Sequence, residues 1–463
     1  MSDPVSDPVS DPSDLDGRSV VVAGGGIAGM AAAQALVELG AAVTVVDAKP
    51  LDAPSPLRTT TDERLPADTA LVVTSPGWRP TAPLLRAAAA AGVPVWGDVE
   101  LAWRLRPRGQ KWLGITGTNG KTTTTGMLAA ILLAAGRRSV AAGNIGLPLT
   151  DAVRKMPPYE VIAAELSSFQ LHWARSLDPV AAAVLNIAED HLDWHGSMAE
   201  YAAAKGKIFG PNTIPIYDAD DAGARDLVAS LVGAVGVTRT TPGERTLGVV
   251  DGELVDRAFG GGAILPVDEL PVTGPHNVTN ALVAAALARA VGITPAEIAT
   301  GLRTFVVGGH RVELLGTIGD IRFIDDSKGT NPHATAAALD AFPTSVWIAG
   351  GLAKGASFDA LIRDHGQQLR GAVLIGTCAP EIEQAIARHA AHVPVIRTAD
   401  LDNAVRTAID LASPGGVVLL SPAAASMDMF DDYKHRGEVF AAAVRAAGGP
   451  AFTPVSLAVK ENR

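Results

Sequence analysis

Residues Leu113 to Gly126 read LGITGTNGKTTTTG, and this stretch decides the fold of the chain. Lys111 to Thr116 is a short apolar run that predicts a buried strand, residues 117–120 predict a glycine-rich loop, and Lys121 begins a helical pattern. A strand, such a loop and a helix form a phosphate-binding unit, because loop N–H groups and the helix N-terminus surround phosphate oxygens. The predicted ligand is a nucleoside triphosphate.

Two side chains of this stretch have predicted roles: Lys121 reaches the terminal phosphates, and the hydroxyl of Thr122 ligates magnesium. The strict consensus G-x-x-x-x-G-K-[ST] is not met, since Ile115 stands where its first glycine belongs. Ordinary strand-to-helix punctuation is the alternative interpretation, but three spaced glycines before Lys-Thr favour the phosphate site.

Length and composition bound the class of protein. A chain of 463 residues predicts roughly three domains, and 48% apolar residues with 19% charged residues predict a soluble α/β protein. The net charge of -11 argues against a nucleic-acid surface. A single cysteine, Cys378, permits no intrachain disulfide, and neither a signal peptide nor a membrane span is visible. The predicted location is the cytoplasm.

The N-terminal part predicts a nucleotide-binding start after a disordered acidic Ser-Asp-Pro tail at residues 1–16. Strands at 18–23 and 43–46 flank a helix at 27–39, and Gly24 to Gly29 fits G-x-G-x-x-G. Asp47 closes the second strand near the spacing of a ribose-binding or base-binding carboxylate. An NAD site, a site for another nucleotide and a ligand-free turn all remain open. A further strand at 70–74 leads into Ser75-Pro76-Gly77.

Polar residues follow three further strands of the middle part. Asn144 follows the strand at 139–142, Glu165 ends the strand at 160–166, and His191 follows the strand at 180–187. Each of them alone fits a solvated loop, but parallel strands bring their carboxyl ends to one edge, which favours a magnesium site beside Thr122.

The rest of the chain predicts a hairpin, a helix and a third sheet. Residues 249–255 predict a hairpin around Asp-Gly, GPHNVTN at 274–280 begins an alanine-rich helix, and 308–311 form a glycine hinge. Strands at 322–324, 346–349, 372–375, 394–396 and 416–420 alternate with helices and predict a doubly wound parallel sheet. The predicted domains are 17–110, 111–312 and 313–463.

Five motifs occur in order: GTNGKT, AGNIG, ELSSFQ, NIAEDHLD and GPHNVTN. With them, residues 17 to 450 resemble the Mur ligase family of ATP-dependent amide-forming enzymes, in which the GxxGxxGKT spacing is usual. DSKGTN and LLSPAAAS look most like the members that join D-glutamate to UDP-N-acetylmuramoyl-L-alanine in peptidoglycan precursor synthesis. Two positions depart from the family: Ala424 stands where cysteine is common, and Asp218 where asparagine is common.

The resemblance implies a three-domain α/β fold. Its parts are an N-terminal Rossmann-like domain for the uridine substrate, a central P-loop ATPase-like domain and a C-terminal doubly wound Rossmann-like domain for D-glutamate. It also implies that ATP phosphorylates the substrate carboxylate, that the amine of D-glutamate attacks the acyl phosphate, and that ADP and phosphate leave. Two Mg²⁺ ions and a carbamylated Lys205 belong to this expectation. The resemblance also implies a monomer that acts on small molecules, with no nucleic-acid partner and no insertion into a membrane.

The resemblance further assigns residues to four kinds of site. The catalytic residues are Lys121, Lys205 and His191, and the metal ligands are Thr122, Glu165, His191 and Lys205. The ATP site contains Gly117, Thr118, Asn119, Gly120, Lys121, Thr122, Thr123, Asn277, Arg311 and Asp326. The uridine-substrate site contains Gly26, Ile27, Ala28, Asp47, Ser75, Pro76, Gly77, Asn144, Ser168 and Gln170. The D-glutamate site contains Lys328, Thr330, Lys354, Ser426, Met427 and Tyr433.

Three rival interpretations differ in the features that they leave unexplained. A folylpolyglutamate synthase shares the ATP domain but lacks the first nucleotide-binding domain. A Rossmann oxidoreductase would use the Gly24 to Gly29 loop for NAD. A non-catalytic nucleotide switch leaves the histidine and lysine sites unexplained.

Overall fold

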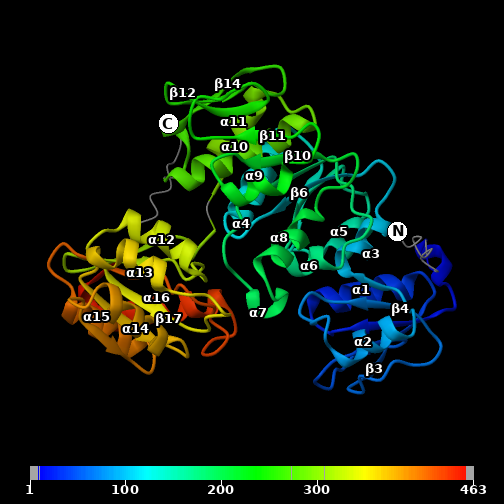
Figure 1. The fold of residues 1–463 in the computed structure, drawn as a ribbon, viewed down its shortest axis with the longest axis horizontal. Helices are drawn as coiled ribbons and strands as arrows, with labels where there is room; N and C mark the ends of the chain where they lie inside the picture. The colour runs from blue at the N-terminus through cyan, green and yellow to red at the C-terminus, as the bar shows by residue number, and fades with distance from the viewer. Residues whose placement is uncertain (1–8, 10, 273, 307, 455–463) are drawn as a thin grey trace. The chain divides into compact units, whose positions relative to one another are not determined.

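The computed structural model describes residue 9 and residues 11–272, 274–306 and 308–454. The chain forms three α/β domains, each built on its own sheet (Figure 1). The three α/β parts expected from the sequence are present, and each sheet lies within one of the three residue ranges predicted above. The boundaries themselves, at residues 110 and 312, stay predictions.

The first sheet has five parallel strands in the order β3-β2-β1-β4-β5. Helices α1 and α3 cover the face that Val20 and Val22 of β1 present, and α2 covers the other face. The elements are η1 Pro12–Leu15, β1 Ser19–Ala23, α1 Ile27–Glu38, β2 Ala42–Val46, β3 Arg58–Thr60, β4 Thr69–Thr74, α2 Pro83–Ala90, β5 Val95–Gly97 and α3 Asp98–Leu105.

Residues 11–16 differ from the disordered tail that the composition predicts; residues 1–8 and 10 lie outside the described part. Asp11 caps the 3-10 helix η1, and Val9 and Leu15 are buried in the core of the first domain. Two apolar side chains among the Ser-Asp-Pro repeats therefore bury enough surface to order this segment.

The central sheet has nine strands in the order β14-β13-β12-β11-β10-β9-β6-β8-β7. It is parallel from β7 to β12, and a hairpin turning at Asp251-Gly252 adds β13 antiparallel, as the sequence predicts. The elements are β6 Lys111–Thr116, α4 Lys121–Ala134, β7 Ser139–Gly143, α5 Leu149–Arg154, β8 Val161–Glu165, α6 Ser168–His172, β9 Ala181–Val184, α7 Leu192–His195, α8 Met198–Gly206, β10 Ile214–Asp218, α9 Ala222–Val228, β11 Val235–Val237, β12 Thr246–Val250, β13 Glu253–Asp256, β14 Gly262–Pro266, η2 Val267–Glu269, α10 Pro275–Ala290 and α11 Pro295–Arg303.

The third sheet has the order β19-β18-β17-β20-β16-β15-β21. Its five predicted strands are parallel, but β15 and β21 join antiparallel, which the sequence analysis did not predict. Only residues 319–320 connect β15 to β16, too few for a parallel crossover, so the two strands form a hairpin. The elements are β15 Glu313–Ile318, β16 Ile321–Asp325, α12 Pro332–Ala341, β17 Val346–Gly350, α13 Asp359–His365, η3 Gly366–Gln368, β18 Gly371–Ile375, α14 Ala379–His389, β19 Val395–Arg397, α15 Leu401–Leu411, β20 Val417–Leu420, α16 Tyr433–Gly448, η4 Gly449–Ala451 and β21 Phe452–Pro454.

By its internal packing the chain divides into two compact units. One contains the first and central domains without residues 188–196, and the other contains these nine residues together with the C-terminal domain. Among the described helices, none is both long and apolar enough to cross a membrane.

Helix α3 belongs to two hydrophobic cores at once. Its Leu101 packs into the first domain, while Val99, Ala102 and Trp103 pack into the central domain. The completely buried Glu100 lies on the same helix and accepts hydrogen bonds from the backbone N–H groups of residues 175 and 176, from the Ser176 hydroxyl and from Arg104 Nε, at 2.6–3.0 Å. Burial alone raises a carboxyl pKa, but these donors outweigh it and hold the pKa of Glu100 below its ordinary value.

Replacing Glu100 by alanine should destabilise the pair of domains strongly. The Glu100→Ala variant leaves buried donors and the Arg104 charge without their acceptor, at a cost of about 3–5 kcal/mol. Thermal unfolding followed by circular dichroism should show a lower midpoint temperature for the transition in which these two domains unfold. Glu253→Ala, which changes an exposed carboxylate on β13, is the matched control. Equal midpoints for the two variants would contradict the role of Glu100.

Candidate active site

The phosphate loop connects the end of β6 to the start of α4, as predicted. Gly117 and Gly120 have φ angles of 152° and 82°, a region that favours glycine. A Cβ at Gly120 would also lie 2.5 Å from Oδ1 of Asn280, and a Cβ at Gly117 would lie 2.9 Å from Cβ of Leu185. Both backbone shape and space therefore require glycine at these two positions.

Two lysines converge on this loop. Lys121 Nζ donates to the carbonyl oxygens of Gly117 and Thr118, at 2.8 and 2.9 Å. Lys205 Nζ, from α8, donates to the same Gly117 oxygen at 2.8 Å and lies 4.6 Å from the centre of the Tyr201 ring. Lys205 is only 1% exposed. The structure thus brings together the two lysines that the sequence predicts to be catalytic.

Helix α10 supplies amide side chains beside the loop. Asn280 Nδ2 donates to Asn277 Oδ1 at 3.2 Å, and Asn280 Oδ1 accepts from the hydroxyl of Thr124. On the other side, Asn186 Oδ1 accepts from the backbone N–H of Asn119 at 2.8 Å. The sequence analysis missed Asn280 and Asn186. The spacing of Asn280, three residues after Asn277 on one helix face, is the signal that would have found it.

Glu165 is buried at the end of β8 with one oxygen engaged. Its Oε1 accepts from Asn144 Nδ2 at 2.9 Å, whereas Oε2 has no hydrogen-bond partner among the described residues. A buried carboxylate oxygen without a donor suits a hard cation, because Mg²⁺ prefers oxygen ligands. These residues therefore fit the predicted magnesium site. Thr122 and Thr123 lie in the first turn of α4.

Gln170 has a packing role in the structure. Its side chain completes a capping box with Ser167 at the start of α6, and Nε2 donates to Asp98 Oδ2 at 3.0 Å. Burial raises the pKa of Asp98 to about 6. Both ends of the Gln170 amide are thus engaged, and its predicted contact with a substrate stays a prediction. The adjacent Ser168 is buried in the first turn of α6.

The first-domain residues predicted to bind a nucleotide lie in neighbouring loops that follow strands β1, β2 and β4. A Cβ at Gly24 would lie 2.0 Å from Ser75 Oγ, so the glycine loop and the Ser75-Pro76-Gly77 loop adjoin directly. Asp47 Oδ2 accepts from the N–H of Gly25 at 2.8 Å, and this hydrogen bond lowers the pKa of the carboxyl group. Ile27 is 81% exposed beside them, although it is a large apolar residue. Gly26 precedes it as the N-cap of α1, and Ala28 follows it in the first turn of that helix.

Residues 188–196 lie in the unit that contains the C-terminal domain. Asp190 Oδ1 pairs with Lys354 Nζ at 2.7 Å, and its Oδ2 accepts from Asn331 Nδ2 at 3.3 Å. His191 Nε2 lies 3.5 Å from the same Oδ2. His191 and Lys354 therefore share one carboxylate. Of the predicted metal ligands, His191 lies in this unit, and Thr122, Glu165 and Lys205 lie in the other.

The remaining predicted D-glutamate residues surround the loop after β16. Lys328 Nζ donates to Tyr433 Oη at 3.3 Å and lies 4.8 Å from its ring centre. Asp326, predicted for ATP, is buried and accepts from the hydroxyl of Ser421 at 2.7 Å; burial raises its pKa to about 7. Thr330 is half-buried, Ser426 is buried and Met427 is exposed.

Arg436 fixes this loop from helix α16. It is completely buried, and its guanidinium donates to the backbone oxygens of Ser327 and Ala424, at 2.7 and 3.0 Å. Burial lowers its pKa to about 10, which leaves the group protonated at neutral pH. The sequence analysis missed this residue, because its partner Ser327 lies 109 residues away in the chain.

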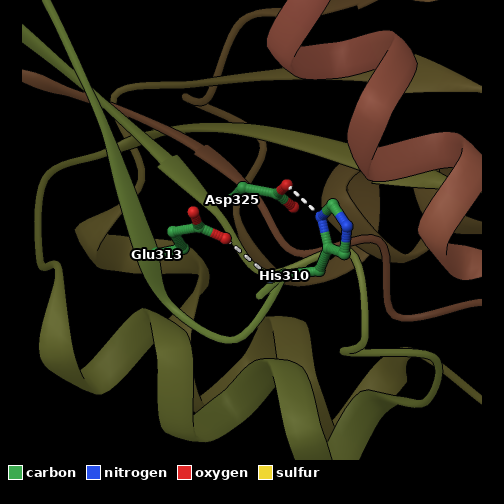
Figure 2. Close-up of side chains that lie close together, drawn as sticks. All are labelled: His310, Glu313 and Asp325. Atoms are coloured by element: carbon green, nitrogen blue, oxygen red, sulfur yellow. Dashed lines mark hydrogen bonds and ion pairs between the residues drawn. The ribbon is translucent and has the colours of Figure 1, made fainter. Parts of the chain in front are cut away.

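His310, Glu313 and Asp325 form a cluster, called the His310 clamp below, at the start of the C-terminal domain (Figure 2). His310 Nδ1 lies 2.7 Å from Asp325 Oδ2, and its backbone N–H donates to Glu313 Oε2 at 2.8 Å. Its backbone oxygen accepts from the N–H of Lys328. These side chains are of metal-binding types. We interpret them as a clamp because the ring nitrogen and the carboxylate are already at hydrogen-bond distance.

Comparisons with known proteins agree with this geometry. The Mur ligase middle domain matches residues 115–288, the Mur ligase glutamate ligase domain matches 310–424, and the alanine dehydrogenase/PNT C-terminal domain matches 13–59. A protein of Frankia casuarinae named UDP-N-acetylmuramoylalanine--D-glutamate ligase is 56% identical, over 94% of this chain and 95% of its own. The chain belongs to the Mur ligase family.

Further relatives agree with that placement. A Streptomyces coelicolor protein with the same ligase name is 50% identical over 94% of this chain and 99% of its own. The crystal structure of a MurF ligase from Thermotoga maritima in complex with ADP has a TM-score of 0.58 and 15% identity, over 96% of this chain and 100% of that one. At this identity the likeness shows that the two chains share a fold. It supports no further conclusion about this chain.

The His310 clamp predicts a stability effect in the C-terminal domain. His310→Ala leaves the buried Asp325 carboxylate without its ring partner, at a cost of about 1–3 kcal/mol. Gly437→Ala should act similarly, because its Cβ would lie 2.1 Å from His310 Nδ1. Urea unfolding should show both effects, with His392→Ala, at an exposed position, as the control. A His310→Ala protein as stable as the control would contradict the clamp.

Proposed function

We propose that this chain joins D-glutamate to UDP-N-acetylmuramoyl-L-alanine, with ATP converted to ADP and phosphate, in peptidoglycan precursor synthesis. An acyl phosphate is the intermediate, and the enzyme works in the cytoplasm as a monomer. The observation that carries the proposal is the meeting of Lys121 and Lys205 at the phosphate loop. Relatives up to 56% identical, named for this reaction, support the choice of substrates.

Lys121 acts on the phosphates of ATP. Its present partners are loop carbonyls, which are weak acceptors beside a phosphate oxygen, so the ammonium can turn to the β and γ phosphates. The N–H groups of residues 117–123 and the start of α4 surround the phosphates, and Asn277, Arg311 and Asp326 contact the rest of the nucleotide.

Thr122, Glu165, His191 and a carbamylated Lys205 would hold two magnesium ions. Bound magnesium supplies positive charge against the phosphates and the carboxylate. The free Oε2 of buried Glu165 supports this assignment.

The electrostatics at Gly117 support a carbamate on Lys205. Both Lys121 Nζ and Lys205 Nζ lie 2.8 Å from one oxygen, so the two nitrogens are at most about 5.6 Å apart. Two ammonium groups at that distance repel by about 3 kcal/mol at an effective dielectric constant of about 20. A carbamate on Lys205 reverses the sign of this interaction and provides a carboxylate for metal.

The substrates bind at the carboxyl edges of the first and third sheets, and residues of the central domain complete the site for the uridine substrate. Gly26, Ile27, Ala28, Asp47 and the Ser75-Pro76-Gly77 loop hold the uridine nucleotide, and Asn144, Ser168 and Gln170 position its sugar and peptide end. In the C-terminal domain Lys328 and Lys354 take the carboxylates of D-glutamate, and Thr330, Ser426, Met427 and Tyr433 complete the site. The lysines contribute most to affinity, because charge-assisted hydrogen bonds are roughly twice as strong as neutral ones.

The decisive experiment is phosphate release from ATP with UDP-N-acetylmuramoyl-L-alanine and a panel of amino acids. D-glutamate should support turnover, while L-glutamate, L-alanine and diamino acids should not. Phosphate release that needs both co-substrates excludes a nucleotide switch. Turnover with another amino acid would overturn the D-glutamate assignment and leave the ligase assignment intact.

Lys205→Ala should be nearly inactive and partly rescued by short-chain carboxylates. Such an anion can occupy the space of the carbamate and restore the negative charge, whereas it cannot replace an ammonium group. The measurement is phosphate release with and without acetate or propionate. Lys207→Ala, two residues along the chain and exposed, controls for general salt effects. Equal responses of the two variants to carboxylates would rule out the carbamate.

Lys354→Ala should raise the KM for D-glutamate at least tenfold and change the KM for ATP less than twofold. The reason is the loss of one charge-assisted contact, worth about 1.5–3 kcal/mol. Steady-state kinetics with each substrate varied in turn measure both constants. Lys434→Ala removes an exposed lysine of the same domain and should change neither. A defect confined to the uridine substrate would show that Lys354 serves another site.

A further inference from the structure

A basic cavity lies at the edge of the central sheet opposite the phosphate loop. It has a volume of about 330 Å³ and is lined by Pro107, Arg108, Gly109, Gln110, Lys111 and Arg137, together with Arg138, Pro158, Tyr159, Glu160, Val161 and Val291. Four of these side chains are cationic and one is a carboxylate, in a chain whose net charge is -11. We propose that this cavity binds a small molecule that carries a multiply charged phosphate group.

The cations of the cavity have few protein partners. Within the described residues, the side chains of Arg108 and Lys111 form no hydrogen bond or ion pair. Arg137 interacts electrostatically with the half-buried Glu297 and contributes to the lowered pKa of that carboxyl group. Arg138 donates to the carbonyl oxygen of Pro158 at 2.6 Å and lies 3.9 Å from Glu160. The lining therefore has more positive charge than its one carboxylate balances.

Rigid segments hold the cations around the cavity. Lys111 begins β6, and its N–H donates to the carbonyl oxygen of Glu160. Arg137 and Arg138 follow Gly136, whose φ of 66° ends α4 sharply. The linker is fixed where Gln110 Nε2 donates to the Tyr159 carbonyl oxygen at 3.1 Å. The backbone positions from which these cationic side chains extend are therefore fixed around the cavity.

The arrangement favours phosphate over carboxylate. The charges come from three directions: the linker, the start of β6 and the turn after α4. A tetrahedral phosphate presents oxygens in several directions, and guanidinium groups bind such oxygens in pairs. The positions of Arg137 and Arg138 can be explained without a ligand, because cations stabilise the negative end of the α4 dipole. That effect does not explain the positions of Arg108 and Lys111.

This cavity is distinct from the nucleotide site. Strand β6 has six residues and α4 has fourteen, and each has one end at the phosphate loop and the other at the cavity. At the rise per residue of a strand and a helix, each element spans about 20 Å. A ligand here would contact the far ends of both elements that carry the phosphate loop.

Calorimetric titration with inorganic pyrophosphate, without metal, tests the proposal on the full-length protein. In Lys121→Ala, where the phosphate loop is weakened, pyrophosphate should still bind at one site. Adding Arg108→Ala, Lys111→Ala and Arg137→Ala should weaken that binding at least tenfold. The control adds Arg86→Ala, Arg363→Ala and Arg406→Ala, which remove the same number of exposed charges elsewhere. Circular dichroism confirms that each variant is folded.

Equal weakening by the cavity and control substitutions, or no binding in Lys121→Ala, would overturn the proposal. Tighter binding of citrate than of pyrophosphate would overturn the preference for phosphate. Co-sedimentation with vesicles that contain phosphatidic acid, whose phosphomonoester headgroup can carry two negative charges, distinguishes the source of the phosphate. Binding to vesicles that depends on the same three cations assigns a lipid headgroup, and pyrophosphate binding without vesicle binding assigns a free solute.

Discussion

The carbonyl oxygen of Gly117 is the point on which the central site depends. Two lysines, one from each of two helices, donate to it at 2.8 Å. Gly117 itself adopts a φ of 152°, a conformation that other residues rarely adopt. The two lysines therefore bring positive charge to one carbonyl oxygen, and two ammonium groups this close repel each other.

Charge in the C-terminal loops is controlled by burial. Asp326 has a pKa raised to about 7, and Asp325 also has a raised pKa, because both carboxylates lie in the protein interior. Neighbouring groups offset that cost: the Ser421 hydroxyl serves Asp326, and the His310 ring serves Asp325. Such buried polar groups fix a loop in one conformation when every partner is present. The loop that presents Lys328 is thus positioned before any substrate binds.

The sequence predicted those features that depend on local pattern. The strand at Lys111 to Thr116, the loop and the helix from Lys121 occur where the motif places them. Contacts across long separations could not be predicted in this way. Asp190 and Lys354 are 164 residues apart, and Arg436 meets Ser327 across 109 residues. No short sequence motif spans separations of that length. In a different way, the motif around Gln170 implies a contact with substrate, whereas the structure shows this side chain in a helix cap.

The Asp190–Lys354 pair also shows why sequence domains and packing units differ. Residues 188–196 are joined covalently to the central domain at both ends, yet they pack with the C-terminal unit. Lys354 supplies the charge that holds Asp190, and Asn331 supplies a second donor. A D-glutamate carboxylate bound to Lys354 would share that ammonium with Asp190, so the position of His191 and the occupancy of the amino-acid site would be linked through a single side chain.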